Sequence, residues 1–202
     1  MDDDWIFSWR EYAGRVSSSE LQDLWGRILA GELKSPGSYS FRTLEFLKGL
    51  SKYEAELINK VAQFVVSNRI FRGESELLSK EGINLENLIF LQEIGFISGV
   101  ESSGLVGTWK STENDRYIAA LISNTKAIIL EHEDINKIAK AEVYVVTSIG
   151  EQVLALTSFQ PNIEYLESIA KYFAMHGYKV TLADWQQLAE DGRYFNGVEI
   201  KA

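Results

Sequence analysis

The spacing of apolar residues changes along the chain, and this change limits the folds that the sequence can adopt. Up to Gly95, apolar residues recur at steps of three and four, which is the period of an amphipathic helix. After Gly95 the chain becomes rich in Gly, Ser and Thr, and short β-prone runs follow. The sequence therefore predicts an α+β fold, with an N-terminal helical part followed by a winged-helix-like or small α+β part.

Helices are expected where apolar stripes follow capping residues. Ser17 to Glu20 and Ser51 to Glu54 match the capping-box pattern, and Asn84 is a favourable N-cap. The helical segments expected on these grounds are 5–16, 17–35, 41–49, 51–65, 73–80, 84–94, 147–156 and 162–176. The run 88–91 is apolar nearly all round, so the helix 84–94 is expected to be deeply buried.

Strands are expected mainly in the second half. Residues 117–122 and 127–131 are β-prone runs separated by a short polar segment, which predicts a hairpin. Further strands are expected at 105–109, 143–146 and 178–182, and no element is assigned from Gln186 onward. These elements divide the chain into a helical domain, 1–72, and a winged-helix-like α+β domain, 73–202. The alternative is one continuous domain.

Composition excludes several classes of site. The chain has no Cys, which removes disulfides, thiolate zinc sites and cysteine nucleophiles. No apolar run reaches the roughly 18 residues that span a bilayer, and the acidic start at Asp2 to Asp4 is unlike a signal peptide. We expect a cytoplasmic protein with no membrane association. The same acidic start, directly before a helical pattern, also fits a chain cut from a longer protein.

The negative charge lies mostly in the second half. The formal net charge is -9, of which residues 1–80 carry -1 and residues 81–202 carry -8. In a winged-helix unit, the candidate recognition helix would be 84–94. The segment around it, 81–109, contains four Glu and no Lys or Arg. Such a helix is repelled by backbone phosphates, so nucleic acid is not an expected partner.

The densest polar cluster lies at 32–43. Ser38, Ser40, Arg42 and Thr43 are the candidate ligand-binding residues, because they would surround a helix N-terminus that favours anions. The structural alternative is that the serines cap the helix and Arg42 pairs with Glu32 or with carbonyl groups of the preceding helix.

No catalytic or metal centre is expected. His132 lies among acidic residues without a second histidine nearby, which favours a solvated acidic turn. His176 ends a helix, where a protonated imidazole complements the helix dipole. The sequence contains no glycine-rich phosphate loop and no Gly-x-Ser-x-Gly elbow, and we expect no cofactor.

Aromatic residues are abundant near the N-terminus. The spacing of Trp25 with Leu21, Ile28 and Leu29 predicts that Trp25 is buried in the core. Trp5, Trp9 and Tyr12 share one helical face, which serves either as a contact surface or as core.

Two segments together resemble a bacterial family of unknown function. The first is Leu-Gln-x-Leu-Trp-x-x-Ile-Leu-Ala-Gly-Glu at 21–32, followed by Pro-Gly-Ser-x-Ser-x-Arg-Thr-Leu at 36–44. The second, at 146–154, is similar to that family's Leu-Thr-x-x-Gly-x-x-Leu element, with Val146 in place of Leu. The family implies no activity. The helix around Trp25 is more loosely similar to phage abortive-infection proteins, which implies a role in defence.

Three functions remain open on these grounds. The first is a non-enzymatic protein-interaction or regulatory module that binds a protein partner or a second copy of the chain. The second is a DNA-associated regulator that uses its winged-helix-like domain, with contacts from the less acidic N-terminal half. The third is a metal-dependent hydrolase with carboxylate ligands.

Overall fold

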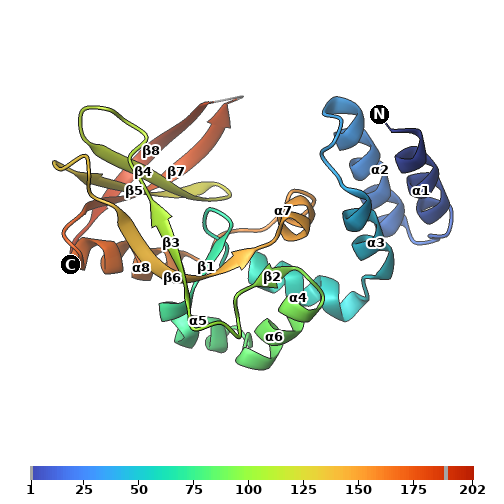
Figure 1. The fold of residues 1–202 in the computed structure, drawn as a ribbon, viewed down its shortest axis with the longest axis horizontal. Coiled ribbons are helices and arrows are strands. Elements are labelled where there is room, and N and C mark those ends of the chain that lie inside the picture. The colour runs from blue at the N-terminus through green and yellow to red at the C-terminus, as the bar shows by residue number, and fades with distance from the viewer. Residues whose placement is uncertain (1, 189–190) are drawn as a thin grey trace.

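A computed structural model describes residues 2–188 and 191–202, and it confirms the α+β fold. Helices dominate the first half and antiparallel strands the second (Figure 1). The helices are α1 (Asp3–Ala13), α2 (Ser19–Lys34), α3 (Phe41–Gly49), α4 (Lys52–Ala62), η1 (Arg72–Glu74), α5 (Ser75–Lys80), α6 (Leu85–Glu93), α7 (Ser148–Leu154) and α8 (Ile163–Met175). The strands are β1 (Arg69–Phe71), β2 (Ile97–Ser98), β3 (Leu105–Trp109), β4 (Tyr117–Ser123), β5 (Lys126–His132), β6 (Ala139–Val146), β7 (Lys179–Leu188) and β8 (Asp191–Ile200).

Side-chain caps fix where the helices begin. Ser51 and Glu54 form the predicted capping box at the start of α4, and Asn84 caps α6 as expected. The predicted Ser17–Glu20 box is wrong by one residue. Ser18 is the N-cap of α2, and its hydroxyl accepts a hydrogen bond from the amide of Leu21. Because three serines stand in a row, each satisfies the cap preference and the sequence pattern alone does not select one.

The first sheet is built around β6. Strands β1 and β2 flank β6 in the order β1-β6-β2, and β3 also pairs with β6; every pairing is antiparallel. Along the chain, α4, β1, α5 and α6 precede β2 and β3, and β6 returns only after the β4–β5 hairpin. Strand β1 therefore joins a segment directly after the N-terminal helices to a strand some seventy residues later.

The second sheet has the order β4-β5-β7-β8 and is antiparallel throughout. The predicted hairpin is confirmed: β4 and β5 join through a tight turn in which Asn124 adopts a positive φ of 49°. The strand expected at 178–182 is longer, since β7 runs to Leu188, and β8 adds an edge strand that the sequence pattern did not indicate. Helix α8 packs against β7.

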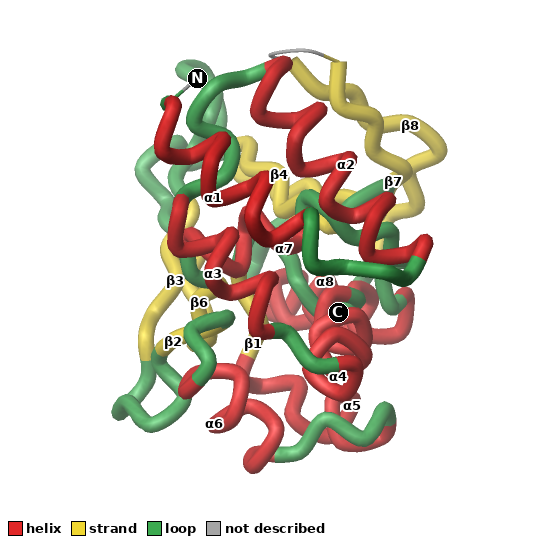
Figure 2. The backbone as a smooth tube through the Cα atoms, turned by 90° about the vertical axis from the view of Figure 1, so that its right-hand side faces the viewer, coloured by secondary structure: helices red, strands yellow, loops and turns green. Residues whose placement is uncertain are grey.

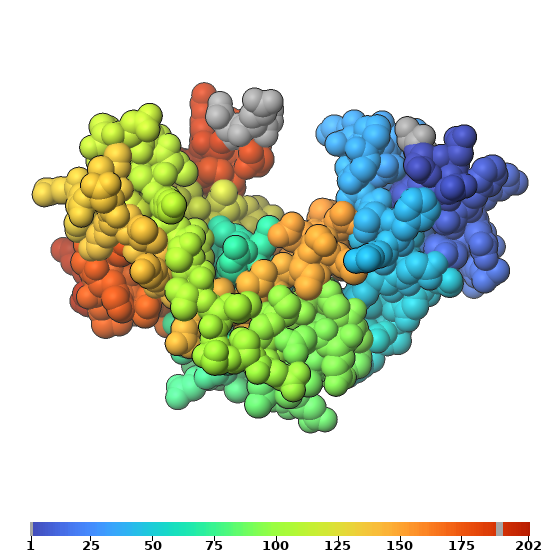
Figure 3. Space-filling model, viewed as in Figure 1, coloured from blue at the N-terminus to red at the C-terminus, as the bar shows by residue number. Residues whose placement is uncertain are grey.

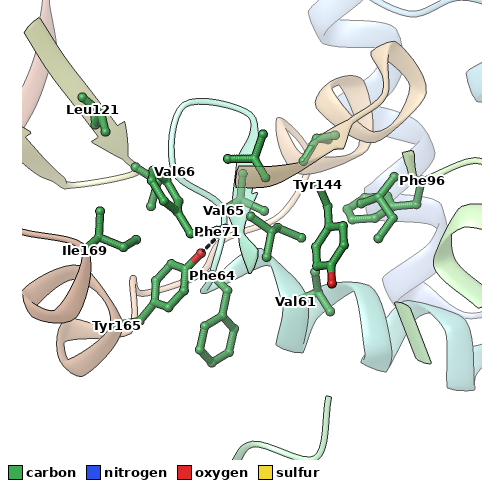
Figure 4. Packing of buried hydrophobic residues seen from close by; sticks show 14 of the residues in the cluster. Val61, Phe64, Val65, Val66, Phe71, Phe96, Leu121, Tyr144, Tyr165 and Ile169 are labelled. Carbon is green, nitrogen blue, oxygen red and sulfur yellow. Dashed lines mark hydrogen bonds between the residues drawn. The ribbon is translucent and has the colours of Figure 1, made fainter. Parts of the chain in front are cut away.

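A continuous hydrophobic cluster runs through the described residues from Trp5 to Val180. At its centre the hydroxyl of Tyr165, which is fully buried, accepts a hydrogen bond from the amide of Phe71 at 2.7 Å (Figure 4). The deep burial expected for the helix 84–94 is found on one side only. Leu88 and Leu91 are buried, but Leu85 is 61% exposed because α6 lies at the surface with one side in the core.

The N-terminal helices stand apart from the second sheet. Helices α1 to α3 form one arm of a V-shaped molecule, the β4-β5-β7-β8 sheet forms the other, and α7 lies between them (Figures 1 and 3). Seen from the side of the helical arm, α1, α2 and α3 lie in front of the sheets (Figure 2). Among the described residues, no helix is long and apolar enough to cross a membrane.

Candidate functional site

The turn after α2 is organised by a buried carboxylate. Glu32 is 3% exposed, and its two oxygens accept hydrogen bonds from the amides of Gly37 at 2.6 Å and Tyr39 at 3.1 Å. Gly37 has a φ of 90°, which a residue with a side chain adopts only with strain. The carboxylate therefore satisfies backbone donors that the tight turn would otherwise leave unpaired.

The predicted pairing of Arg42 with Glu32 or with helix carbonyls is wrong. Backbone amides occupy both oxygens of Glu32, and Arg42 is exposed. Within the described residues, Arg42 makes no ion pair or hydrogen bond. The sequence pattern pointed to a charged partner because Glu and Arg are obvious complements, whereas the turn's own amides lie nearer to the carboxylate.

The hydroxyl groups of the candidate ligand site bind other parts of the protein. Ser40 caps α3 by accepting from the amide of Thr43 at 3.2 Å, and Ser38 donates to the carbonyl of Ser35 at 2.6 Å. Thr43 is fully buried. Of the four candidates, Arg42 alone presents an unused polar group to solvent, and a ligand-binding role for the set remains a prediction.

Helix α7 supplies the partner for this cluster. The side-chain oxygen of Gln152 accepts hydrogen bonds from the amide of Ser40 at 2.9 Å and from the hydroxyl of Thr43 at 2.5 Å. Arg27, on α2, donates to the carbonyl of Leu156 just after α7, at 2.6 Å. We call this contact the α3–α7 junction. It joins the two sequence segments that carry the family resemblance, although more than a hundred residues separate them.

The glycine of the second segment is required by close packing. Thr147 caps α7, accepting from the amide of Gly150 at 3.1 Å and donating to the carbonyl of Gly95 at 2.6 Å. A Cβ atom on Gly150 would overlap the carbonyl oxygen of Phe96. The Thr-x-x-Gly pattern therefore fixes α7 against the end of α6. The position of α7 in turn places Gln152 within hydrogen-bonding distance of Ser40 and Thr43 at the start of α3.

Aromatic side chains complete the helical arm. Trp25 is 3% exposed, which confirms its predicted place in the core. The indole of Trp5 donates to the carbonyl of Tyr39 at 2.7 Å, and that of Trp9 donates to the carbonyl of Trp25 at 2.9 Å. Trp5 is buried, Trp9 is partly buried, and Tyr12 contacts the Trp25 ring edge-on, so the α1 aromatic face packs inward. Burial also raises the pKa of the Tyr39 hydroxyl.

The histidines have structural partners. The Nδ1 atom of His132 accepts from the amide of Asp134 at 3.0 Å, and Nδ1 of His176 lies 2.7 Å from the carbonyl of Tyr172. In the part of the chain that the structure describes, no group of three or more His, Asp and Glu residues is arranged to hold a metal ion.

The surface of α6 combines apolar and acidic groups. Leu85 is 61% exposed, and Glu86 and Glu93 are exposed on the same short helix. Tyr53, at the start of α4, is 59% exposed and contacts the ring of Phe90 at a centroid distance of 6.2 Å. We call these residues (Tyr53, Leu85, Glu86, Phe90 and Glu93) the α6 surface. Its exposed apolar area is typical of a protein contact and unlike a phosphate contact.

Comparison with known proteins gives one family match. Residues 1–77 match a family described as a protein of unknown function (DUF2806). The matched segment includes the helical arm, α4 and β1. The match agrees with the resemblance to a family of unknown function that the N-terminal segment suggested. Searches of curated proteins and of solved structures returned no match.

Proposed function

We propose that this protein is a non-enzymatic protein-interaction module built on a winged-helix-like unit, residues 52–146. The order α4, β1, α5, α6, β2, with strand order β1-β6-β2, supports this assignment, because winged-helix units place one strand after the first of three helices and close a small sheet with the last strand. Strands β3 and β6 pair as wing strands do, and the β4–β5 hairpin, which joins the second sheet, is inserted between them in the chain. Pairing of β1 with β6 also supports one continuous domain in place of a division at residue 72.

The α6 surface is the observation that carries the proposal. In a DNA-binding unit of this kind, the third helix enters the major groove and needs cations near the phosphates. Here that helix presents Glu86, Glu93 and the exposed Leu85, and the segment 81–109 contains no Lys or Arg. A partner protein with an apolar and basic surface, or a second copy of the chain offering one, fits these groups better than a nucleic acid does.

The second candidate is a DNA-associated regulator. The winged-helix-like order of elements favours it, and the first 80 residues, with a net charge of -1, would supply the contacts. The carboxylate-only hydrolase has no such support, since the described residues hold no group of three metal-binding side chains. We extend the proposal to a bacterial, cytoplasmic protein in phage defence, on the strength of the sequence resemblance around Trp25.

Two measurements test the proposal. Fluorescence anisotropy with duplex DNA near 150 mM salt is expected to give a dissociation constant above about 1 μM, because the helix in the recognition position, α6, lacks cations. Affinity purification of the tagged chain after nuclease treatment is expected to recover a stoichiometric partner, and the Leu85→Ser, Tyr53→Ser double variant is expected to lose it.

The control is Leu33→Ser, which removes a similarly exposed apolar side chain (61%) from the far helical arm. Sub-micromolar DNA binding, or equal loss of the partner in the control and the α6 variant, would contradict the proposal.

A further inference from the structure

A cavity with aromatic and acidic walls lies between η1, β6 and α8. It has a volume of about 250 Å³ and is lined by Phe71, Gly73, Glu74, Ala141, Glu142, Ile169 and Tyr172. Helix η1 contacts both β6 and α8, and Tyr172 of α8 is hydrogen-bonded to Lys140 of β6. The pairing of β1 with β6 brings these elements together. The volume suits one long side chain of another molecule better than a complete cofactor.

The aromatic walls are held in place before any ligand arrives. The Phe71 ring is stacked on Trp109, with ring centroids 5.5 Å apart and an interplanar angle of 4°. Its amide donates to the fully buried Tyr165 hydroxyl (Figure 4). Tyr172 is fixed by donating its hydroxyl hydrogen to the carbonyl of Lys140 at 3.2 Å. Fixed aromatic rings bind without a large loss of side-chain entropy.

The carboxylates of the cavity have no internal partner. Glu74 and Glu142 form no ion pair or hydrogen bond with any of the described residues. Aromatic faces attract soft organic cations, and carboxylates accept hydrogen bonds from them. Trp109 covers one face of Phe71, so the half-buried Tyr172 offers the stacking face, and Phe71 closes the cavity behind it. The combination favours a guanidinium group, which packs on one ring and donates to two carboxylates at once.

A second hollow of about 300 Å³ continues from the first and shares Gly73 and Glu74 with it. Together the two hollows are lined by five Glu and only two Lys, and one of these, Lys80, is already paired with Glu164 at 2.9 Å. The negative potential therefore extends beyond the space of a single side chain. An extended basic chain fits this shape and charge, whereas a free amine would leave the second hollow unused.

We propose that this acidic groove binds a basic peptide segment of a protein partner, with an arginine side chain in the aromatic cavity. This inference rests on the proposed function, because it names the chemistry of a partner segment, and it concerns a surface distinct from the α6 surface.

The probe is fluorescein-labelled hexa-arginine, with hexa-lysine and hexa-citrulline as comparison peptides, followed by anisotropy at 50 and 150 mM salt. Hexa-arginine is expected to bind more tightly than hexa-lysine, and neutral hexa-citrulline is expected not to bind. The Glu74→Gln, Glu142→Gln double variant should weaken hexa-arginine binding by about tenfold or more. Tyr172→Leu should reduce the preference for arginine over lysine, because it removes a stacking face.

The matched control is Glu86→Gln, Glu93→Gln, which removes the same charge from α6 and should change the affinity by less than about twofold. Equal loss in the control would show general acidity instead of a site. No binding of hexa-arginine, or unchanged binding in the Glu74 and Glu142 variant, would overturn the inference. The partner recovered through the α6 surface would be unaffected by either result, so the two proposals fail separately.

Discussion

Replacing Glu32 by alanine tests whether one buried carboxylate holds the turn after α2. The change removes two hydrogen bonds to a charged acceptor, and such bonds contribute about 1.5 to 3 kcal/mol each. Gly37 is exposed, so water can replace its lost partner, whereas the amide of Tyr39 lies in a buried residue. Relief of the cost of burying a charge offsets part of the loss. We expect the free energy of unfolding to fall by about 2 to 4 kcal/mol.

The measurement is urea denaturation followed by tryptophan fluorescence, because Trp5 bonds directly to the Tyr39 carbonyl and reports on this turn. Glu32→Gln keeps one acceptor oxygen and should lose about half as much stability. The control, Glu56→Ala, removes an exposed carboxylate and should cost less than about 0.5 kcal/mol. A Glu32→Ala variant as stable as this control would refute the view that the carboxylate organises the turn.

Four further predictions concern packing and ionisation. Trp25→Ala should cost about 3 to 5 kcal/mol, measured in the same urea titration, because Trp25 is a large core side chain. Gly150→Ala should destabilise by about 1 to 3 kcal/mol through overlap with the Phe96 carbonyl. Gly26→Ala, where an added Cβ meets no atom within 4 Å, should instead stabilise by about 1 kcal/mol. Burial raises the pKa of Tyr178 to about 12, so the unfolded chain loses this proton first. Stability should therefore fall between pH 10 and about 12, and Tyr178→Phe should reduce that slope.

Local patterns predicted those elements whose residues carry their own signals. The β4–β5 hairpin, α8 and the capped start of α4 follow from alternation, helical periodicity and capping residues within a few positions. Strand β8 was missed because Gly192, Asn196 and Gly197 interrupt its alternation. Hydrogen bonding to β7 holds β8 as a strand despite these interruptions. The positive φ of Asn196 accommodates an irregularity in the register of the two strands.

The candidate site depended on contacts that no local pattern contains. The sequence singled out Ser40 and Thr43 as polar residues near a helix start, but their partner, Gln152, lies over a hundred residues away. Likewise, the sequence suggested an ion pair between Glu32 and Arg42. Only the fold shows that amides of the turn donate to both oxygens of the Glu32 carboxylate. The acidic groove is built in the same way, since Glu74 and Glu142 meet only when β1 pairs with β6.

The central position of β6 also sets the order in which the protein can fold during synthesis. Strand β1 emerges from the ribosome early, but its only strand partner in the described chain is β6, which ends at Val146. At typical rates of elongation, the ribosome takes roughly 4 to 15 s to synthesise the residues between the end of β1 and the end of β6. During that interval Ile70 and Phe71, which the finished fold buries almost completely, have no sheet to join. Nascent chains of intermediate length should therefore be the form that chaperones bind, while the helical arm can already have packed around Trp25.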